Sequence, residues 1–188
     1  MSTIIWFIIS FLSGSLPFSL WLGRLAGKDI RQYGDGNPGA TNTWKAAGPF
    51  LGMAAVVLDF SKGAIPILLV NFVLNLEGWS LAVVALAPIL GHAFSPFLRF
   101  RGGKALAVTF GVWCGLSLWL APTALGISFA LWLFILKKDG RAVLAGMLSL
   151  LILLLIIRAD TAWLLIWLGN TAILAWKTRF PNLHLPDN

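Results

Sequence analysis

The sequence predicts an all-α integral membrane protein with seven transmembrane helices. Of its 188 residues, 59% are hydrophobic, only 11% are charged, and ten are tryptophans. A soluble domain of this length could not enclose so much apolar surface, whereas lipid solvates it directly. We therefore expect a single polytopic membrane domain over residues 1–188.

Apolar stretches of roughly membrane-spanning length define the expected helices. The first stretch lacks both a basic leader and a small-residue cleavage site, so it is predicted to be a retained span rather than a signal peptide. Several later stretches are near the lower length limit for a span, which leaves a tilted bundle or a re-entrant segment as alternatives. The expected spans are 3–23, 49–75, 79–98, 105–120, 121–136, 142–157 and 160–176.

The connections between these spans alternate in charge, which predicts the orientation of the chain. All but two of the fourteen lysines and arginines fall in the first, third and fifth loops and in the tail; the exceptions are Lys62 and Arg158. Because basic loops stay on the cytoplasmic side, we expect the N-terminus outside and the C-terminus in the cytoplasm. This topology explains most of the net charge of +7, so nucleic acid is not expected as a partner.

Cysteine and histidine usage argues against a metal site. Cys114 is the single cysteine, and His92 and His184 lack the spacing of metal ligands. No cluster of carboxylates compensates for them. We expect neither a metal nor another cofactor.

The stretch 91–104, GHAFSPFLRFRGGK, predicts a phosphate site at the membrane surface. Gly102 and Gly103 can reach the dihedrals that turn successive backbone N–H groups onto one anion, and Arg101 and Lys104 supply positive charge. A cytoplasmic loop without a binding role would also carry basic residues. The paired glycines favour the phosphate site.

A second polar segment lies in the loop 24–48, which contains GDGNPGATNTWK. Its glycines loosen the backbone, and its polar side chains present hydrogen-bond donors. A turn-rich loop without a binding role would look similar. Because this loop and the Gly-Gly-Lys loop are expected on the same side of the membrane, we predict a shared site that includes Asn37, Thr41, Asn42 and Lys45.

Asp59 and Lys62 lie three residues apart on one face of the second span, at a depth where an unpaired charge is costly. We expect them to pair with each other. The pair either stabilises helix packing or takes part in binding. His92 has the same two interpretations, as a packing residue or as a substrate contact.

Three ordered segments resemble the internal motifs of the bacterial acyl-phosphate:glycerol-3-phosphate acyltransferases of the PlsY family. They are GDGNPGATN at 34–42, DFSKG at 59–63, and GHAFSPFLRFRGGKALAVT at 91–109, and SGSLPF at 13–18 also fits. The resemblance implies an enzyme of the bacterial inner membrane whose active site faces the cytoplasm. It would move a fatty acyl group from acyl phosphate to the 1-hydroxyl of glycerol 3-phosphate. The product would be lysophosphatidate, for phospholipid synthesis.

The same resemblance implies roles for individual residues. Lys104, Thr41 and Asn42 are the expected catalytic residues, and Lys104 would balance charge during transfer. Because acyl phosphate is already activated, catalysis would rest on holding two anionic substrates together and stabilising the departing phosphate. The acyl chain would lie in an apolar groove between helices. The expected substrate contacts are Asp35, Asn37, Lys45, Asp59, Lys62, His92, Arg101, Gly102, Gly103 and Lys177.

The chain departs from the family pattern at several positions. Asp35 stands where the family usually has serine, and a carboxylate there would repel a dianionic acceptor. Lys45 replaces an arginine and loses the bidentate fork that suits phosphate. The family's serines after the fifth span are missing from 141–146, and its C-terminal His-x-x-Asn-Ile motif is missing from 177–182.

Three functions remain open on the sequence. The first is a glycerol-3-phosphate acyltransferase whose cationic roles have moved to Lys45, Lys177 and Arg179. The second is a divergent membrane acyltransferase with another acceptor, which Asp35 and the altered tail favour. The third is a non-catalytic membrane protein that binds lipid or a partner, and the retained Lys104 argues against it.

Overall fold

The chain folds into a bundle of helices. The computed structural model describes residues 3–179, and every regular element within that range is helical, which confirms the all-α prediction. The longer helices are α1 (Thr3–Ser15), α2 (Phe18–Leu25), α3 (Ala40–Leu68), α4 (Gly78–Ala93), α5 (Leu106–Ser117), α6 (Leu120–Leu136), α7 (Asp139–Ile156) and α8 (Thr161–Arg179). Short 3-10 turns cover Ile30–Gln32 and Pro96–Leu98, and a π-helical turn at Leu69–Val73 extends α3.

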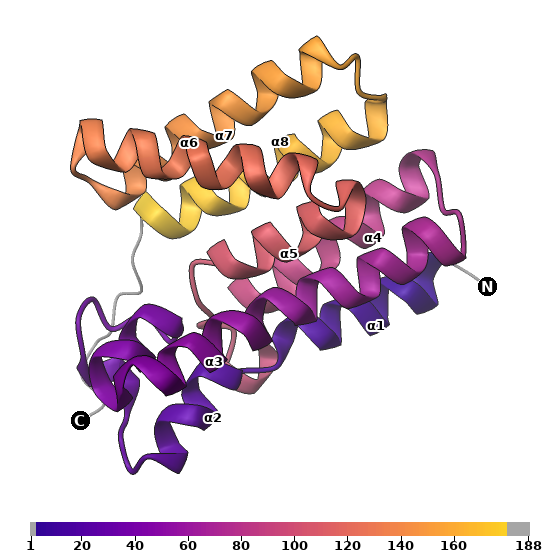
Figure 1. Cartoon of the computed structure of the whole chain (residues 1–188). Helices are drawn as coiled ribbons and strands as arrows, with labels where there is room; N and C mark the ends of the chain where they lie inside the picture. The colour runs from indigo at the N-terminus through magenta and orange to yellow at the C-terminus, as the bar shows by residue number, and fades with distance from the viewer. Residues whose placement is uncertain (1–2, 180–188) are drawn as a thin grey trace.

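Two groups of helices make up the bundle (Figure 1). Helices α6, α7 and α8 lie together on one side, and α1 to α5 form the rest. Helix α4 packs against both α1 and α8 and so joins the two groups. One hydrophobic cluster extends through both groups and includes the fully buried Trp113, Met147 and Ile166.

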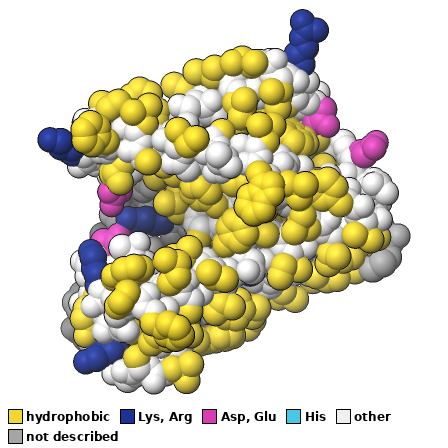
Figure 2. Space-filling view, in the orientation of Figure 1, with side chains coloured by type: hydrophobic (Ala, Val, Ile, Leu, Met, Phe, Trp, Pro, Cys, Tyr) yellow, Lys and Arg dark blue, Asp and Glu magenta, His cyan; other side chains and the backbone are white. Residues whose placement is uncertain are grey.

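The outer surface of the bundle is suited to lipid. Hydrophobic side chains cover most of the face seen in Figure 2, an exposure that water would oppose. Helices α5 and α6 are apolar but shorter, with 12 and 17 residues. Four described segments are long and apolar enough to cross a membrane: Thr3–Leu25, Ala40–Val73, Gly78–Leu98 and Asp139–Ile156.

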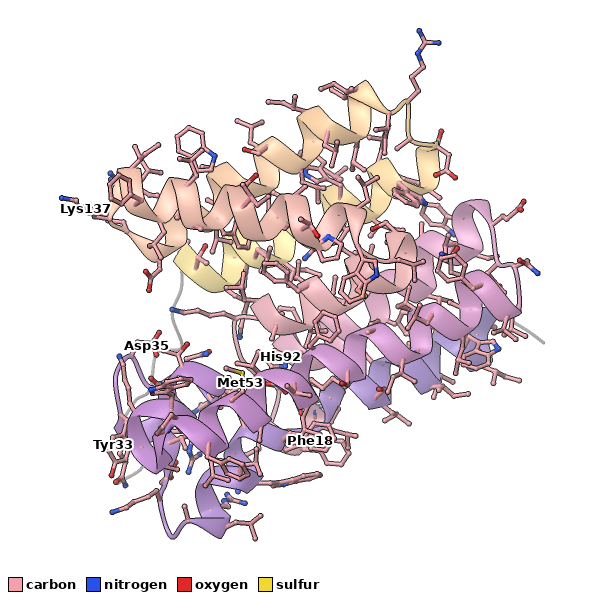
Figure 3. All side chains as sticks on the ribbon, in the orientation of Figure 1. Phe18, Tyr33, Asp35, Met53, His92 and Lys137 are labelled. Atoms are coloured by element: carbon pink, nitrogen blue, oxygen red, sulfur yellow. The ribbon has the colours of Figure 1, made fainter. Side chains whose placement is uncertain are left out.

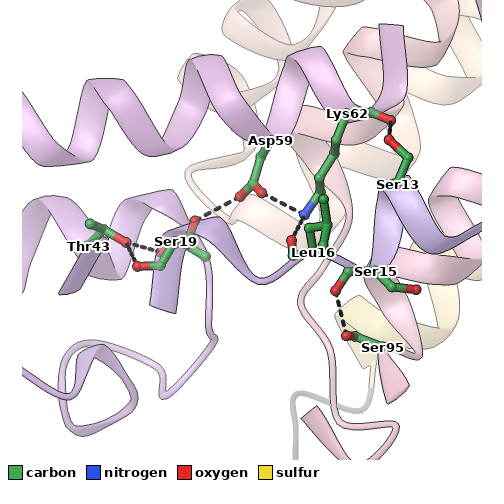
Figure 4. Close-up of polar contacts among 9 residues, drawn as sticks. Ser13, Ser15, Leu16, Ser19, Thr43, Asp59, Lys62 and Ser95 are labelled. Carbon is green, nitrogen blue, oxygen red and sulfur yellow. Dashed lines mark hydrogen bonds and ion pairs between the residues drawn. The ribbon is translucent and has the colours of Figure 1, made fainter. Parts of the chain in front are cut away.

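The first predicted span, 3–23, is not one continuous helix. It breaks at Leu16 and Pro17, because proline has no backbone N–H and cannot continue the helical ladder. Polar side chains satisfy the carbonyl groups that the break exposes. The Ser95 hydroxyl donates to the carbonyl of Ser15 at 2.6 Å, and the Lys62 ammonium donates to the carbonyl of Leu16 at 2.7 Å (Figure 4).

The second predicted span, 49–75, corresponds to the part of α3 after a kink, together with the π-helical turn that follows it. Helix α3 begins at Ala40 and bends at Gly48, whose φ of 89° and ψ of 174° are open to glycine alone. Pro49 follows and contributes no N–H to the ladder. The residues that were expected in a loop, including Thr41 and Asn42, therefore lie on the first turns of a helix.

Glycines bring α3 and α5 into close contact. A side chain at Gly111 would collide with the backbone carbonyl of Phe60, and one at Gly63 would lie 2.6 Å from the carbonyl of Val108. Small residues allow this close approach of helix backbones, as is common in membranes. The contact sets the position of the start of α5 against α3.

The basic connections meet at one end of the bundle. The connections from α2 to α3 and from α4 to α5, the turn between α6 and α7, and the end of α8 lie together there (Figure 1). Figure 2 shows most of the visible lysine and arginine side chains at that end. The spatial arrangement thus reproduces the charge asymmetry read from the sequence.

Candidate active site

A cavity of about 510 Å³ opens at the basic end of the bundle. Figure 2 shows it as a hollow between the two groups of helices, with basic and acidic side chains at its mouth. Its wall comes from α3 to α8 and from the loops before α3 and α5. Eight of the predicted site residues line it: Asp35, Asn37, Thr41, Asn42, Lys45, Asp59, His92 and Lys104.

Part of the cavity wall is apolar. Val56 of α3, Leu106 and Phe110 of α5, and Phe129 and Leu133 of α6 contribute to its wall. The rings of Phe110 and Phe129 meet edge to face with centroids 5.5 Å apart. A cavity with both polar and apolar walls suits an amphipathic ligand.

Lys104 owes its position to close packing of the two glycines before it. A side chain at Gly102 would collide with the carbonyl of His92, and one at Gly103 would press on the His92 imidazole. Ala105 then adopts a left-handed conformation with φ of 61° immediately before α5. Lys104 is therefore held at the cavity wall, between the end of α4 and the start of α5.

Gly102 and Gly103 contribute to the site in a different way from the one that the sequence predicts. Neither Gly102 nor Gly103 has a positive φ, and the Gly103 N–H donates to the carbonyl of His92 at 3.1 Å. That N–H is already used, so it does not turn onto an anion. The glycines are required for space rather than for unusual dihedrals.

Asp35 pairs with Lys104, although 69 residues separate them in the sequence. The Lys104 ammonium lies 2.6 Å from Oδ2 of Asp35. Oδ1 accepts hydrogen bonds from the Asn42 amide at 2.9 Å and from the Asn37 N–H at 3.1 Å. Figure 3 shows Asp35 at the basic end of the bundle and His92 further along it.

These contacts control the ionisation of Asp35. Burial raises the pKa of its carboxyl, but the hydrogen bonds from Lys104, the Asn37 N–H and Asn42, together with the charge of Lys104, outweigh burial and leave the pKa below its ordinary value. Asp35 is therefore a carboxylate at neutral pH. The stabilisation from these contacts is present above the ordinary pKa and is lost as the pH falls through the lowered one.

Asp59 and Lys62 pair as expected. The Lys62 ammonium lies 2.7 Å from Oδ1 of Asp59, and both side chains are only 3% exposed. Oδ2 of Asp59 accepts from the Ser19 hydroxyl at 2.8 Å, and Lys62 also donates to Leu16 (Figure 4). The pair thus ties α3 to the break between α1 and α2, while Asp59 also borders the cavity.

Some predicted substrate contacts do not line the cavity. Arg101 is exposed, and Lys177 is buried with its ammonium 5.3 Å from the centroid of the Phe94 ring. The altered tail positions 180–182 lie outside the described residues. The predicted residues that are absent from the cavity wall are Lys62, Arg101, Gly102, Gly103 and Lys177.

The cavity also contains residues that the sequence did not single out. Asp139 and Gly140 begin α7, and Thr178 lies near the end of α8. All three lie at the basic ends of predicted spans. The alternation of basic and non-basic loops along the sequence was therefore the signal that could have placed Asp139, Gly140 and Thr178 beside Lys104.

Comparison with known proteins identifies relatives of this chain. The family described as glycerol-3-phosphate acyltransferase matches residues 4–183. Glycerol-3-phosphate acyltransferase 1 of Thermotoga maritima is 46% identical over 119 residues, which are 62% of this chain and 59% of that protein. The glycerol-3-phosphate acyltransferase of Desulfovibrio desulfuricans is 36% identical over 95% of this chain and 79% of its own length. The match to the Thermotoga maritima protein thus spans less than two thirds of that relative.

The fold is similar to a solved membrane protein. The crystal structure of PlsY (YgiH), an integral membrane glycerol 3-phosphate acyltransferase, in its glycerol 3-phosphate form superposes with a TM-score of 0.84 at 30% identity. The match covers 96% of this chain and 90% of that one. Its lysophosphatidic acid form gives a TM-score of 0.83.

Proposed function

Because this chain belongs to the glycerol-3-phosphate acyltransferase family, we propose that it transfers a fatty acyl group from acyl phosphate to the 1-hydroxyl of glycerol 3-phosphate. The products are lysophosphatidate and inorganic phosphate, at the start of phospholipid synthesis. The observation that carries this proposal is the single cavity that Lys104 and Asn42 share with an apolar wall. Such a cavity accommodates a phosphorylated head group and an acyl chain together.

The protein contributes little covalent chemistry to this reaction. The glycerol hydroxyl oxygen attacks the acyl carbonyl carbon, the bond from that carbon to the phosphate oxygen breaks, and the hydroxyl proton leaves with the phosphate. Because the donor is activated, positioning and charge stabilisation supply the catalysis. Lys104 stabilises the negative charge on the departing phosphate, and Lys45 adds a second positive charge at the mouth.

The remaining cavity residues orient the substrates. Thr41, Asn37 and Asn42 present polar groups on the side of α3 and the loop before it. The acyl chain lies against the apolar wall, which is formed by Val56, Leu106, Phe110, Phe129 and Leu133. The pair of Asp59 with Lys62 ties α3 to the break between α1 and α2, which supports a structural role for Asp59 at the cavity wall.

An acceptor other than glycerol 3-phosphate was favoured by the charge of Asp35. That charge is paired with Lys104 in the structure, so it does not exclude a phosphorylated acceptor. We therefore favour glycerol 3-phosphate as the acceptor. The non-catalytic alternative is disfavoured because the polar groups gather around a cavity rather than on a surface.

Growth of a bacterial strain depleted of its own glycerol-3-phosphate acyltransferase tests this function. Expression of the chain is expected to restore growth without added phospholipid precursors. Immunodetection in the membrane fraction controls for expression. Absence of growth with the protein present in that fraction would contradict the proposal.

We place the chain in the bacterial inner membrane, with seven spans and with the cavity mouth facing the cytoplasm. The basic connections support this orientation, because they are retained on the cytoplasmic side. The N-terminus then lies outside, and the C-terminus lies in the cytoplasm.

Cysteine labelling in intact cells measures this orientation. In a Cys114→Ser background, a thiol at the exposed Glu77 is expected to react with a membrane-impermeant reagent before lysis. A thiol at the exposed Lys138 is expected to react only after lysis. The reverse pattern of labelling would show that the orientation is inverted.

A further inference from the structure

The donors best placed to bind a phosphate already surround an anion that belongs to the chain itself. Lys104, the Asn42 amide and the Asn37 N–H all donate to the carboxylate of Asp35, at 2.6, 2.9 and 3.1 Å. Carboxylate and phosphate oxygens accept hydrogen bonds from the same kinds of donor. The site at the cavity mouth is therefore built for an anion and is filled by Asp35.

Glycines flank Asp35, and its side chain is held by polar contacts alone. Gly34 and Gly36 flank it with φ values of 60° and 73°, a region that glycine enters without strain. The Asp35 side chain is 46% exposed, so no packed core holds it in place. The contacts that keep it at the mouth are the polar ones to Lys104, Asn42 and Asn37.

A second cation lies beside the same turn. A Cβ atom placed on Gly34 would lie 3.0 Å from the Lys45 ammonium, which puts that ammonium next to the segment that carries Asp35. Lys45 also lines the cavity. If Asp35 leaves, both Lys45 and Lys104 face the space that it occupied.

We propose that Asp35 is a displaceable substitute for the substrate phosphate, which holds Lys104 in the empty enzyme and competes with the phosphate group of the incoming substrate. This inference rests on the function proposed above. Substrate binding exchanges the Asp35–Lys104 ion pair for a phosphate–Lys104 pair. Asp35 thereby weakens the binding of phosphate and keeps Lys104 directed into the cavity mouth until substrate arrives.

Binding of inorganic phosphate to the purified protein tests the competition without requiring turnover. Asp35→Ser is expected to lower the Kd for phosphate about two- to fivefold, the range for loss of one partly exposed competing ion pair. Asp35→Asn, which keeps the shape of the side chain but removes its charge, is expected to do the same. Asp29→Ser is the matched control, because it removes a carboxylate that pairs with Arg31 on the same loop and does not line the cavity.

Steady-state kinetics identifies which phosphate displaces Asp35. Asp35→Ser is expected to lower KM for either glycerol 3-phosphate or acyl phosphate by a similar factor, without lowering kcat. The substrate whose KM falls is the one whose phosphate takes the place of Asp35.

Three results would overturn the inference while leaving the proposed function intact, provided that the wild-type protein transfers acyl groups. One is an unchanged Kd for phosphate in both Asp35 variants. Another is a lower kcat with unchanged KM, which would make Asp35 a positioning residue for Lys104. The third is an equal effect of Asp29→Ser, which would trace the change to general surface charge. A wild-type protein that neither transfers acyl groups nor binds phosphate would overturn the proposed function as well.

Discussion

Lys104→Ala is expected to lower turnover with acyl phosphate about 100-fold or more, because a well-placed charge at the departing group typically contributes that much. Lys104 is the cation held at the cavity wall by the packing of Gly102 and Gly103 against His92. No other lysine or arginine within residues 3–179 combines that position with a direct contact to the anion at the mouth. The initial rate of phosphate release from acyl phosphate, dependent on glycerol 3-phosphate, measures the effect.

Two comparisons make this result specific to Lys104. Lys28→Ala removes an exposed lysine that does not line the cavity and is expected to leave turnover within about twofold of wild type, as for most surface substitutions. The melting temperature of Lys104→Ala in detergent is expected to stay close to that of wild type, since its ion pair is partly exposed. Unchanged turnover in Lys104→Ala would refute the assigned role.

Asp59→Ala is expected to destabilise the protein by about 3–5 kcal/mol, because it leaves the Lys62 ammonium buried without its counter-ion. The change also removes the acceptor of the Ser19 hydroxyl, beside the break between α1 and α2. The thermal unfolding midpoint in detergent should therefore fall well below that of wild type.

The exposed pair of Asp29 and Arg31 provides the contrast. Its atoms approach as closely, at 2.7 Å, but the side chains of Asp29 and Arg31 are 32% and 42% exposed, so Asp29→Ala is expected to cost at most about 1 kcal/mol. The double variant Asp59→Ala with Lys62→Met is expected to be more stable than Asp59→Ala alone, since it removes the unpaired charge. Equal shifts of the unfolding midpoint in Asp59→Ala and Asp29→Ala would show that the buried pair contributes no more to stability than the exposed pair.

Much of the fold could be predicted from the sequence, because lipid imposes a simple rule on it. Long apolar stretches must be helical in a membrane, and basic residues mark the loops of one side. The site residues Thr41, Asn42 and Lys104 were recognisable because short motifs carry them. Asp59 and Lys62 were recognisable as a pair because they are close in sequence on one helical face.

The features that escaped prediction depend on contacts between distant segments. The break at Pro17 is tolerated because Lys62 and Ser95, far along the chain, satisfy the exposed carbonyl groups. The early start of α3 was missed because its glycine-rich beginning resembles a loop. The pair of Asp35 and Lys104 joins residues whose proximity arises only from the packing of α5 against α3.

The same reasoning explains why Gly102 and Gly103 lack the dihedrals expected from the sequence. A Gly-Gly-Lys sequence is typical of a backbone that turns its N–H groups onto an anion. Here the glycines instead allow the chain to pass close to His92 at the end of α4. Only the neighbouring helix distinguishes these two uses of glycine.

Mass spectrometry of the product formed by the purified protein tests the central claim most directly. With acyl phosphate and glycerol 3-phosphate as the only substrates, the chain is expected to form lysophosphatidate acylated at the 1-hydroxyl, with one inorganic phosphate released for each acyl group transferred. Release of free fatty acid without lysophosphatidate, or no reaction by a folded protein, would contradict the assignment of this cavity as a glycerol-3-phosphate acyltransferase site.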